Sequence, residues 1–118
     1  MIKLSIVGTI TSEFNDLVKI LQFGLPSDVI LNEKIRTFGE EINASSEYLI
    51  LYLYRINQNN FQLEAEVFSI RKGLVFLDQI TIELQKLNIS YVFDYFLSDS
   101  QGNFLTREKS RRFQKNEI

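Results

Sequence analysis

Residues 47–70, EYLILYLYRINQNNFQLEAEVFSI, decide the fold. Residues 61–67 alternate apolar and polar side chains, as a strand with one buried and one solvent-facing side does. Residues 47–56 are almost purely leucine, isoleucine and tyrosine, which predicts a strand covered on both faces, either inside the fold or by a partner. The four amide side chains of residues 57–60 favour a turn between them. The stretch therefore predicts a β-hairpin.

A strand and a helix are predicted ahead of this hairpin. Residues 3–10, KLSIVGTI, alternate apolar and polar side chains and are predicted to form the strand. The apolar side chains that follow recur at helical spacing and form one stripe: Phe14, Leu17, Val18 and Leu21. We expect this helix to end at residues 24–26, GLP, because glycine and proline terminate helices.

Residues 27–46 carry two conflicting signals. A helical stripe is formed by Leu31, Ile35, Phe38 and Ile42. Gly39 interrupts this stretch, and β-formers such as Val29 and Ile30 favour two short strands instead. We predict a helix here, with two short strands as the alternative.

A second helix and a further strand are predicted after the hairpin. Within residues 71–88 an apolar stripe is formed by Leu77, Ile80, Leu84 and Leu87. Asn88 suits the end of this helix, because asparagine tolerates the left-handed conformation. Residues 89–97, ISYVFDYFL, are typical of an aromatic-rich strand, and residues 99–103, DSQGN, of a turn.

The order of these elements predicts an α+β fold, a ferredoxin-like split βαβ sandwich. The order is β-α-β-β-α-β, with an extra element before the central hairpin, and we expect an antiparallel sheet with the helices on one face. We assign residues 1–106 to a single globular domain. Residues 107–118 form a basic C-terminal tail with five basic and two acidic side chains. The remaining eight basic and thirteen acidic side chains give residues 1–106 a net charge of −5.

The amino-acid composition excludes several classes of site. The chain has no cysteine and no histidine, so disulfides, thiolate zinc sites, thiol nucleophiles and imidazole acid–base relays are excluded. The longest apolar stretch, residues 48–54, is far too short for a membrane span. The start, MIKLSIVGTITSEF, suits a first strand better than an export segment. We therefore expect a cytoplasmic protein with no membrane contact.

Tyrosines and carboxylates on the predicted strands are the candidate partner-binding residues. They are Tyr48, Tyr52, Tyr54, Glu64, Glu66, Tyr91, Asp94 and Tyr95. With helices on one face only, some of these side chains must project from the open face of the sheet. Which of them share that face depends on the hairpin register, since a slip of one residue reverses it. Tyrosine is also an ordinary strand residue, so this pattern has a purely structural alternative.

No residues show the pattern of a catalytic, metal or cofactor site. As a helix pair Glu40 and Glu41 would point apart, and Glu64 and Glu66 have no recognisable further ligands for a cation. The five glycines form no phosphate-binding run. We expect no catalytic residues, no metal and no cofactor, and hence a protein that is not an enzyme.

These observations favour a protein-binding module that works by occlusion. A small acidic inhibitor or immunity-type protein that blocks a basic toxin or nuclease fits the size, the acidity and the lack of catalytic groups. One alternative is a regulatory or small-ligand-binding domain that forms a homodimer through its sheet. Another is a nucleic-acid accessory protein that uses the basic tail. Glu64, Glu66 and Asp94 argue against nucleic acid on the sheet itself, because binding phosphate there needs lysine and arginine.

Overall fold

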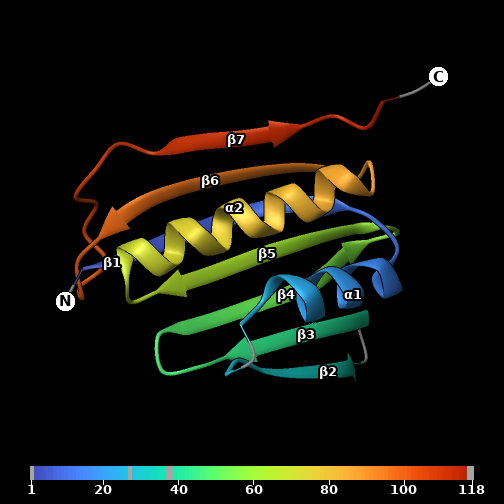
Figure 1. Cartoon of the computed structure of the whole chain (residues 1–118), viewed down its shortest axis with the longest axis horizontal. Coiled ribbons are helices and arrows are strands. Elements are labelled where there is room, and N and C mark those ends of the chain that lie inside the picture. Colours follow the sequence, from blue (N-terminus) through green and yellow to red (C-terminus); the bar gives the residue numbers. More distant parts are fainter. Residues whose placement is uncertain (1, 27, 37–38, 117–118) are drawn as a thin grey trace.

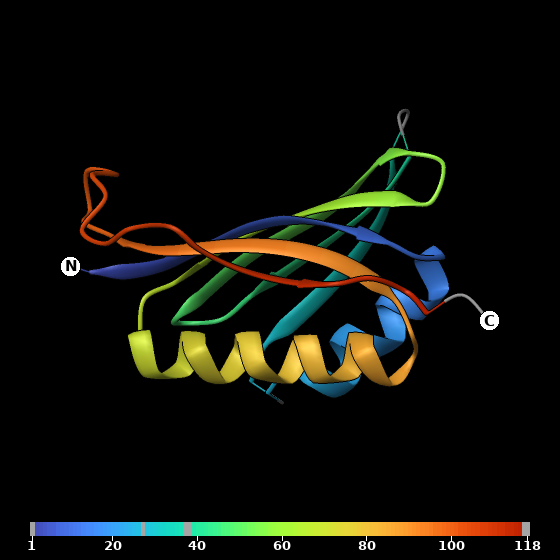
Figure 2. The same cartoon turned by 90° about the horizontal axis from the view of Figure 1, so that it is seen from above.

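A seven-stranded antiparallel sheet and two helices make up the part of the chain that the computed structural model describes, residues 2–26, 28–36 and 39–116 (Figure 1). The strands are β1 (Lys3–Thr11), β2 (Ile30–Arg36), β3 (Gly39–Ser45), β4 (Leu49–Asn57), β5 (Asn60–Val67), β6 (Ser90–Ser98) and β7 (Lys109–Phe113). The helices are α1 (Phe14–Gly24) and α2 (Ile70–Lys86). Both helices lie on one side of the sheet (Figure 2). The predicted α+β class with an antiparallel sheet is confirmed.

The strands follow the order β2-β3-β4-β5-β1-β6-β7 across the sheet. The chain leaves β1 into α1, and α2 connects β5 to β6. Both helices cover the face to which the buried side chains of β1 point, those of Leu4, Ile6 and Ile10. The sheet is larger than the four strands and one extra element that the sequence predicts, because two strands are added beside β4 and one beside β6.

The second helix, α2, packs closely on β1. The side chain of Ser69 caps its start by accepting a hydrogen bond from the backbone N–H of Lys72 at 3.2 Å. A Cβ atom added at Gly73 would lie 2.7 Å from Cδ2 of Leu4, so this glycine permits the close approach. Asn88 follows the helix at a φ of 57°, and the predicted left-handed helix end is confirmed.

The predicted hairpin is formed by β4 and β5, which pair antiparallel. Leu49, Leu51 and Leu53 point from β4 into the core and are 0–1% exposed. The side chains between them are open to solvent, with Ile50 38% and Tyr52 45% exposed. Within the described chain the second face of β4 is therefore not covered, because both helices pack on the face to which the leucines point. Cover of this second face by a partner stays a prediction.

The predicted helix within residues 27–46 is wrong, and the alternative of two short strands is correct. Residues 30–36 and 39–45 are β2 and β3, and β3 pairs with β4. Ile42 and Ala44 alternate into the core opposite the leucines of β4. Gly39 has a φ of 130°, which favours glycine. Pairing with the edge of β4 therefore outweighs the helical spacing in the sequence. Ser27 and residues 37–38 lie outside the described residues.

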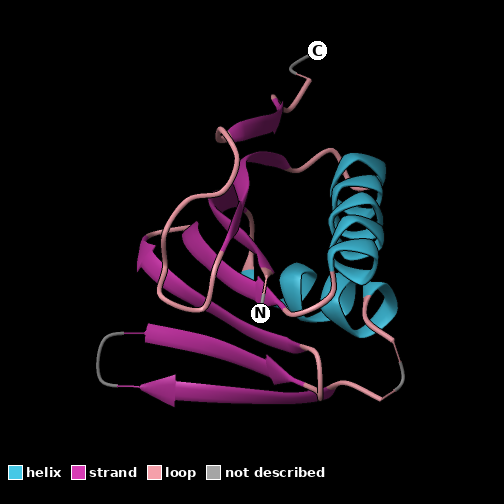
Figure 3. Ribbon diagram, turned by 90° about the vertical axis from the view of Figure 1, so that its left-hand side faces the viewer, coloured by secondary structure: helices cyan, strands magenta, loops and turns pink. Residues whose placement is uncertain are grey.

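The basic C-terminal segment contributes an edge strand. Lys109–Phe113 forms β7 and pairs with β6 (Figure 3). A guanidinium nitrogen of Arg111 donates a hydrogen bond to the carboxylate of Asp78 on α2. The ring of Phe113 stacks on that of Tyr91, with the ring centres 6.2 Å apart. The antiparallel sheet thus continues beyond residue 106, to residue 113.

Candidate interaction surface on the open face of the sheet

The face of the sheet turned away from α1 and α2 is the open face (Figure 3). Because side chains alternate along a strand, every second residue of each strand points from this face. The register of β4, β5 and β1 builds two neighbouring rows across it. In the first row Glu64 lies between Tyr52 and Val7. In the second row Glu66 lies between Ile50 and Ser5. Tyrosine and glutamate therefore share the open face, the arrangement that the sequence left undecided.

These two rows line a shallow groove of about 400 Å³. Its side-chain lining consists of Ser5 and Val7 from β1, Ile50 and Tyr52 from β4, Glu64 and Glu66 from β5, and Phe96 from β6. Two aromatic rings and two aliphatic side chains thus surround two carboxylates. Such a combination suits a ligand with an apolar stem and a positive end.

The carboxylate of Glu64 is held in place by two hydrogen bonds. The hydroxyl of Tyr54 donates to Oε1 at 3.1 Å, and Nε2 of Gln62 donates to the same oxygen at 2.8 Å. Burial raises the pKa of Tyr54, and the hydrogen bond to Glu64 and its negative charge raise that pKa further. The tyrosine hydroxyl therefore stays protonated and keeps donating its hydrogen bond to the carboxylate of Glu64.

Glu66, the second carboxylate of the groove, forms an ion pair with Lys3. The Nζ atom of Lys3 lies 2.8 Å from Oε1 of Glu66. The side chain of Glu66 is 44% exposed and that of Lys3 is 16% exposed, so solvent reaches the pair mainly from the carboxylate.

Asp94 extends the negative charge along the open face. It lies opposite Val7 in the pairing of β1 with β6, next to the row that holds Glu64. The hydroxyl of Ser110 donates a hydrogen bond to Oδ1 of Asp94 at 2.5 Å. Desolvation raises the pKa of the nearby Glu108, and the hydrogen bond to Asp94 and its charge act in the same direction.

Three of the predicted site residues lie away from this surface. Tyr91 and Tyr95 pair with Ile10 and Ile6, so they point to the helix-covered face. Tyr91 is buried there, and its hydroxyl donates a hydrogen bond to Oε1 of Gln85 at 2.9 Å. Tyr48 precedes β4 and lies beside α2, where Nζ of Lys72 is 4.2 Å from the centre of its ring. The structure thus brings together Tyr52, Tyr54, Glu64, Glu66 and Asp94.

Four residues of the groove were missed in the sequence: Ser5, Val7, Ile50 and Phe96. The alternation within β1 held the signal for Val7, since it falls among the polar positions of that strand. Ile50 and Phe96 lie in continuous apolar runs, where alternation gives no indication of which face a residue takes. Only the pairing of the strands identifies them.

Among the described residues, no cluster of three or more carboxylates is placed to hold a metal ion. Neither described helix is long and apolar enough to cross a membrane. No protein-family model matches the sequence, and no curated protein is significantly similar to it.

Proposed function

We propose that this protein is a non-enzymatic binding module that occludes a basic region of a protein partner. The kind of protein that fits is a small inhibitor or immunity-type protein, acting in the cytoplasm on a toxin or nuclease. The single observation that carries this proposal is the strand register, which places Tyr52 beside Glu64 and Ile50 beside Glu66 in one groove.

The groove provides both halves of a lysine or arginine recognition site. The aliphatic stem of such a side chain would lie along the rings of Tyr52 and Phe96, and its charge would face Glu64 and Glu66. A cation over an aromatic ring contributes about 0.5–2 kcal/mol, depending on how far it is desolvated. The excess of carboxylates would also accelerate encounter with a basic partner.

The test is capture of the partner from the native source by the tagged chain, with mass spectrometry as the readout. We expect one stoichiometric basic protein. The double variant Tyr52→Ala, Glu64→Gln should lose it, whereas Glu83→Gln should retain it. Glu83→Gln is the matched control for Glu64→Gln, because it removes the same charge from α2, which lies on the other side of the sheet.

The kinetics of the purified complex separate the two parts of the proposal. The association rate should fall steeply as the salt concentration rises, because charge steers the encounter. A rate that does not respond to salt would remove the electrostatic part. Undiminished capture by the double variant would overturn the use of the open face altogether.

A second candidate function is a regulatory domain that dimerises through the open face. The observation in its favour is that Val7, Ile50 and Val92 all point from this face and are 38–39% exposed. A second copy would cover them, and would also cover the second face of β4. Light scattering at high protein concentration tests this candidate, and a strictly monomeric mass would contradict it.

We further propose that the core is a ferredoxin-like split βαβ unit with three added strands. The order β4-β5-β1-β6, with α1 after β1 and α2 between β5 and β6, supports this assignment. In this view β7 extends the edge at β6, and β2 and β3, inserted in the chain between α1 and β4, extend the edge at β4.

A further inference from the structure

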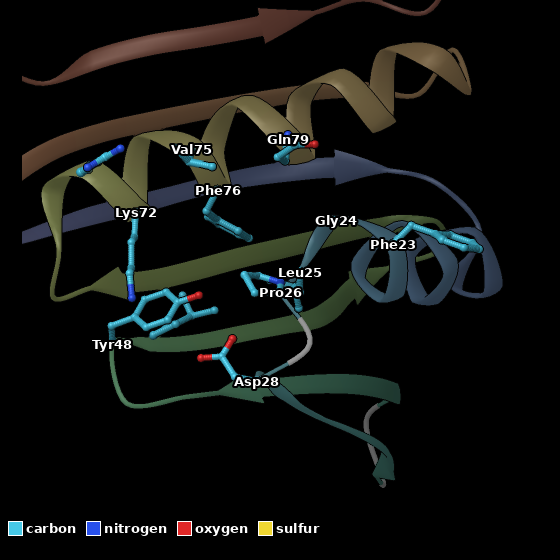
Figure 4. Close-up of a pocket in the computed structure, with 12 residues that line it drawn as sticks. Phe23, Gly24, Leu25, Pro26, Asp28, Tyr48, Lys72, Val75, Phe76 and Gln79 are labelled. Atoms are coloured by element: carbon cyan, nitrogen blue, oxygen red, sulfur yellow. The ribbon is translucent and has the colours of Figure 1, made fainter.

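An apolar hollow lies on the helix side of the molecule, away from the open face (Figure 4). It has a volume of about 480 Å³. One wall is a stripe along α2, formed by Lys72, Val75, Phe76 and Gln79. The opposite wall is the end of α1 and the turn after it, formed by Phe23, Gly24, Leu25 and Pro26. Leu49 and Tyr48 come from the start of β4 and the residue before it.

Two of the apolar side chains that line this cavity are largely exposed to solvent. Phe23 is 80% exposed and Val75 is 54% exposed. Figure 4 shows Phe76 extending from α2 toward Leu25 and Pro26. A volume of this size, with mostly apolar walls and a few polar groups, is characteristic of small-molecule sites.

The polar groups of the cavity give it a net positive charge. Arg71 and Lys72 line it from the first turn of α2, and Asp28 is the single carboxylate in the lining. Figure 4 shows Lys72 reaching toward the ring of Tyr48 and Asp28 lying beyond that ring. Burial raises the pKa of Tyr48, and the charge of Asp28 raises it further, so its hydroxyl remains a hydrogen-bond donor.

Arg71 and Lys72 do not stabilise α2 through their charge. The partial positive charge at the start of a helix disfavours lysine and arginine there, and α2 has no acidic residue in its first turn to offset them. No described residue forms an ion pair with Arg71. The guanidinium of Arg71 is therefore available to bind an anion, and arginine binds carboxylates through two parallel hydrogen bonds.

We propose that this cavity binds a small hydrophobic carboxylic acid, such as a medium-chain fatty acid. Its tail would lie between Val75, Phe76 and Leu25, and its carboxylate would face Arg71 and Lys72. The charge balance of the lining selects an anion over a neutral or cationic amphiphile of the same length. The site shares no residue with the groove of the open face, so this proposal can be tested independently of the protein-binding proposal.

The test uses three amphiphiles of equal chain length, decanoate, decanol and decylammonium, each below the concentration at which it forms micelles. Calorimetry gives the affinities, and backbone NMR shifts locate the site. Decanoate should bind most tightly and decylammonium most weakly, with shifts at Gly24, Val75 and Gln79. Equal affinity for decanoate and decanol, or shifts confined to the open face, would overturn the proposal.

Three variants of exposed residues on α2 sharpen this test. Arg71→Gln should weaken decanoate about tenfold and leave decanol nearly unchanged, because it removes one charge-assisted pair. Val75→Trp should weaken both compounds, since the larger side chain occupies the cavity. Lys86→Gln removes a cation at the other end of α2 and should change neither affinity. Unchanged decanoate binding in Arg71→Gln would contradict the assigned role of the arginine.

Discussion

The two faces of β4 differ sharply in their exposure to solvent. Leu51 is fully buried under the helices, whereas its neighbour Tyr52 is 45% exposed in the groove of the open face. Burying a leucine side chain contributes about 1.5–3 kcal/mol, whereas an ion pair at a solvent-exposed surface contributes about 1 kcal/mol or less. One face of the strand therefore stabilises the fold, and the other is available for recognition.

The largest expected effect is a difference in the free energy of unfolding between substitutions on the two faces of β4. Leu51→Ala should lower the free energy of unfolding by about 2–5 kcal/mol, because it leaves a cavity under the helices. Tyr52→Ala should cost about 1 kcal/mol or less. Urea unfolding of both variants measures the difference. Similar losses in the two variants would show that the open face is covered in solution.

A smaller effect is expected at Gly8, where the helix-covered face of β1 has no room for a side chain. A Cβ atom there would lie 2.0 Å from the backbone oxygen of Val92 and 2.5 Å from Cδ1 of Phe93. Gly8→Ala should therefore lower the free energy of unfolding by about 1–3 kcal/mol, because β6 must shift. Thr9→Ala, on the open face of the same strand, should cost less than about 1 kcal/mol in the same thermal or urea unfolding experiment. Equal stability of Gly8→Ala and the wild type would contradict this close packing.

The smallest effect concerns the pKa of Tyr54 on the open face. Its folded-state pKa lies above the ordinary value, so its contribution to stability is constant below a pH of about 10 and declines as the pH rises further. Glu64→Gln should lower the Tyr54 pKa part of the way back, since burial remains while the charge is removed. An alkaline ultraviolet titration, with Tyr54→Phe as the reference, measures this. Identical titrations of wild type and Glu64→Gln would show that the carboxylate has no influence on the tyrosine.

The candidate site could be predicted only in part from the sequence. The Tyr52, Tyr54, Glu64 and Glu66 side chains were identified because they alternate along two strands joined by a short turn. For Tyr91 and Tyr95 the face stays undecided in the sequence, because their strand is largely apolar on both sides, and only the pairing with β1 assigns them to the helix-covered face. The cavity beside α2 was not foreseen, because it joins residues of α1, β4 and α2 that are distant in the chain.

The sequence by itself determined the elements whose stabilising contacts are local. Helical spacing located α1 and α2, alternation located β1 and β5, and composition excluded cysteine and histidine chemistry. The tertiary structure alone decided that residues 30–36 and 39–45 are strands and that residues 109–113 extend the sheet. Strands added at the sides of a sheet form by hydrogen bonding to a neighbour, so their conformation depends on a partner strand that local spacing does not reveal. The same dependence on pairing decided which tyrosines face solvent, because register is a property of two strands together.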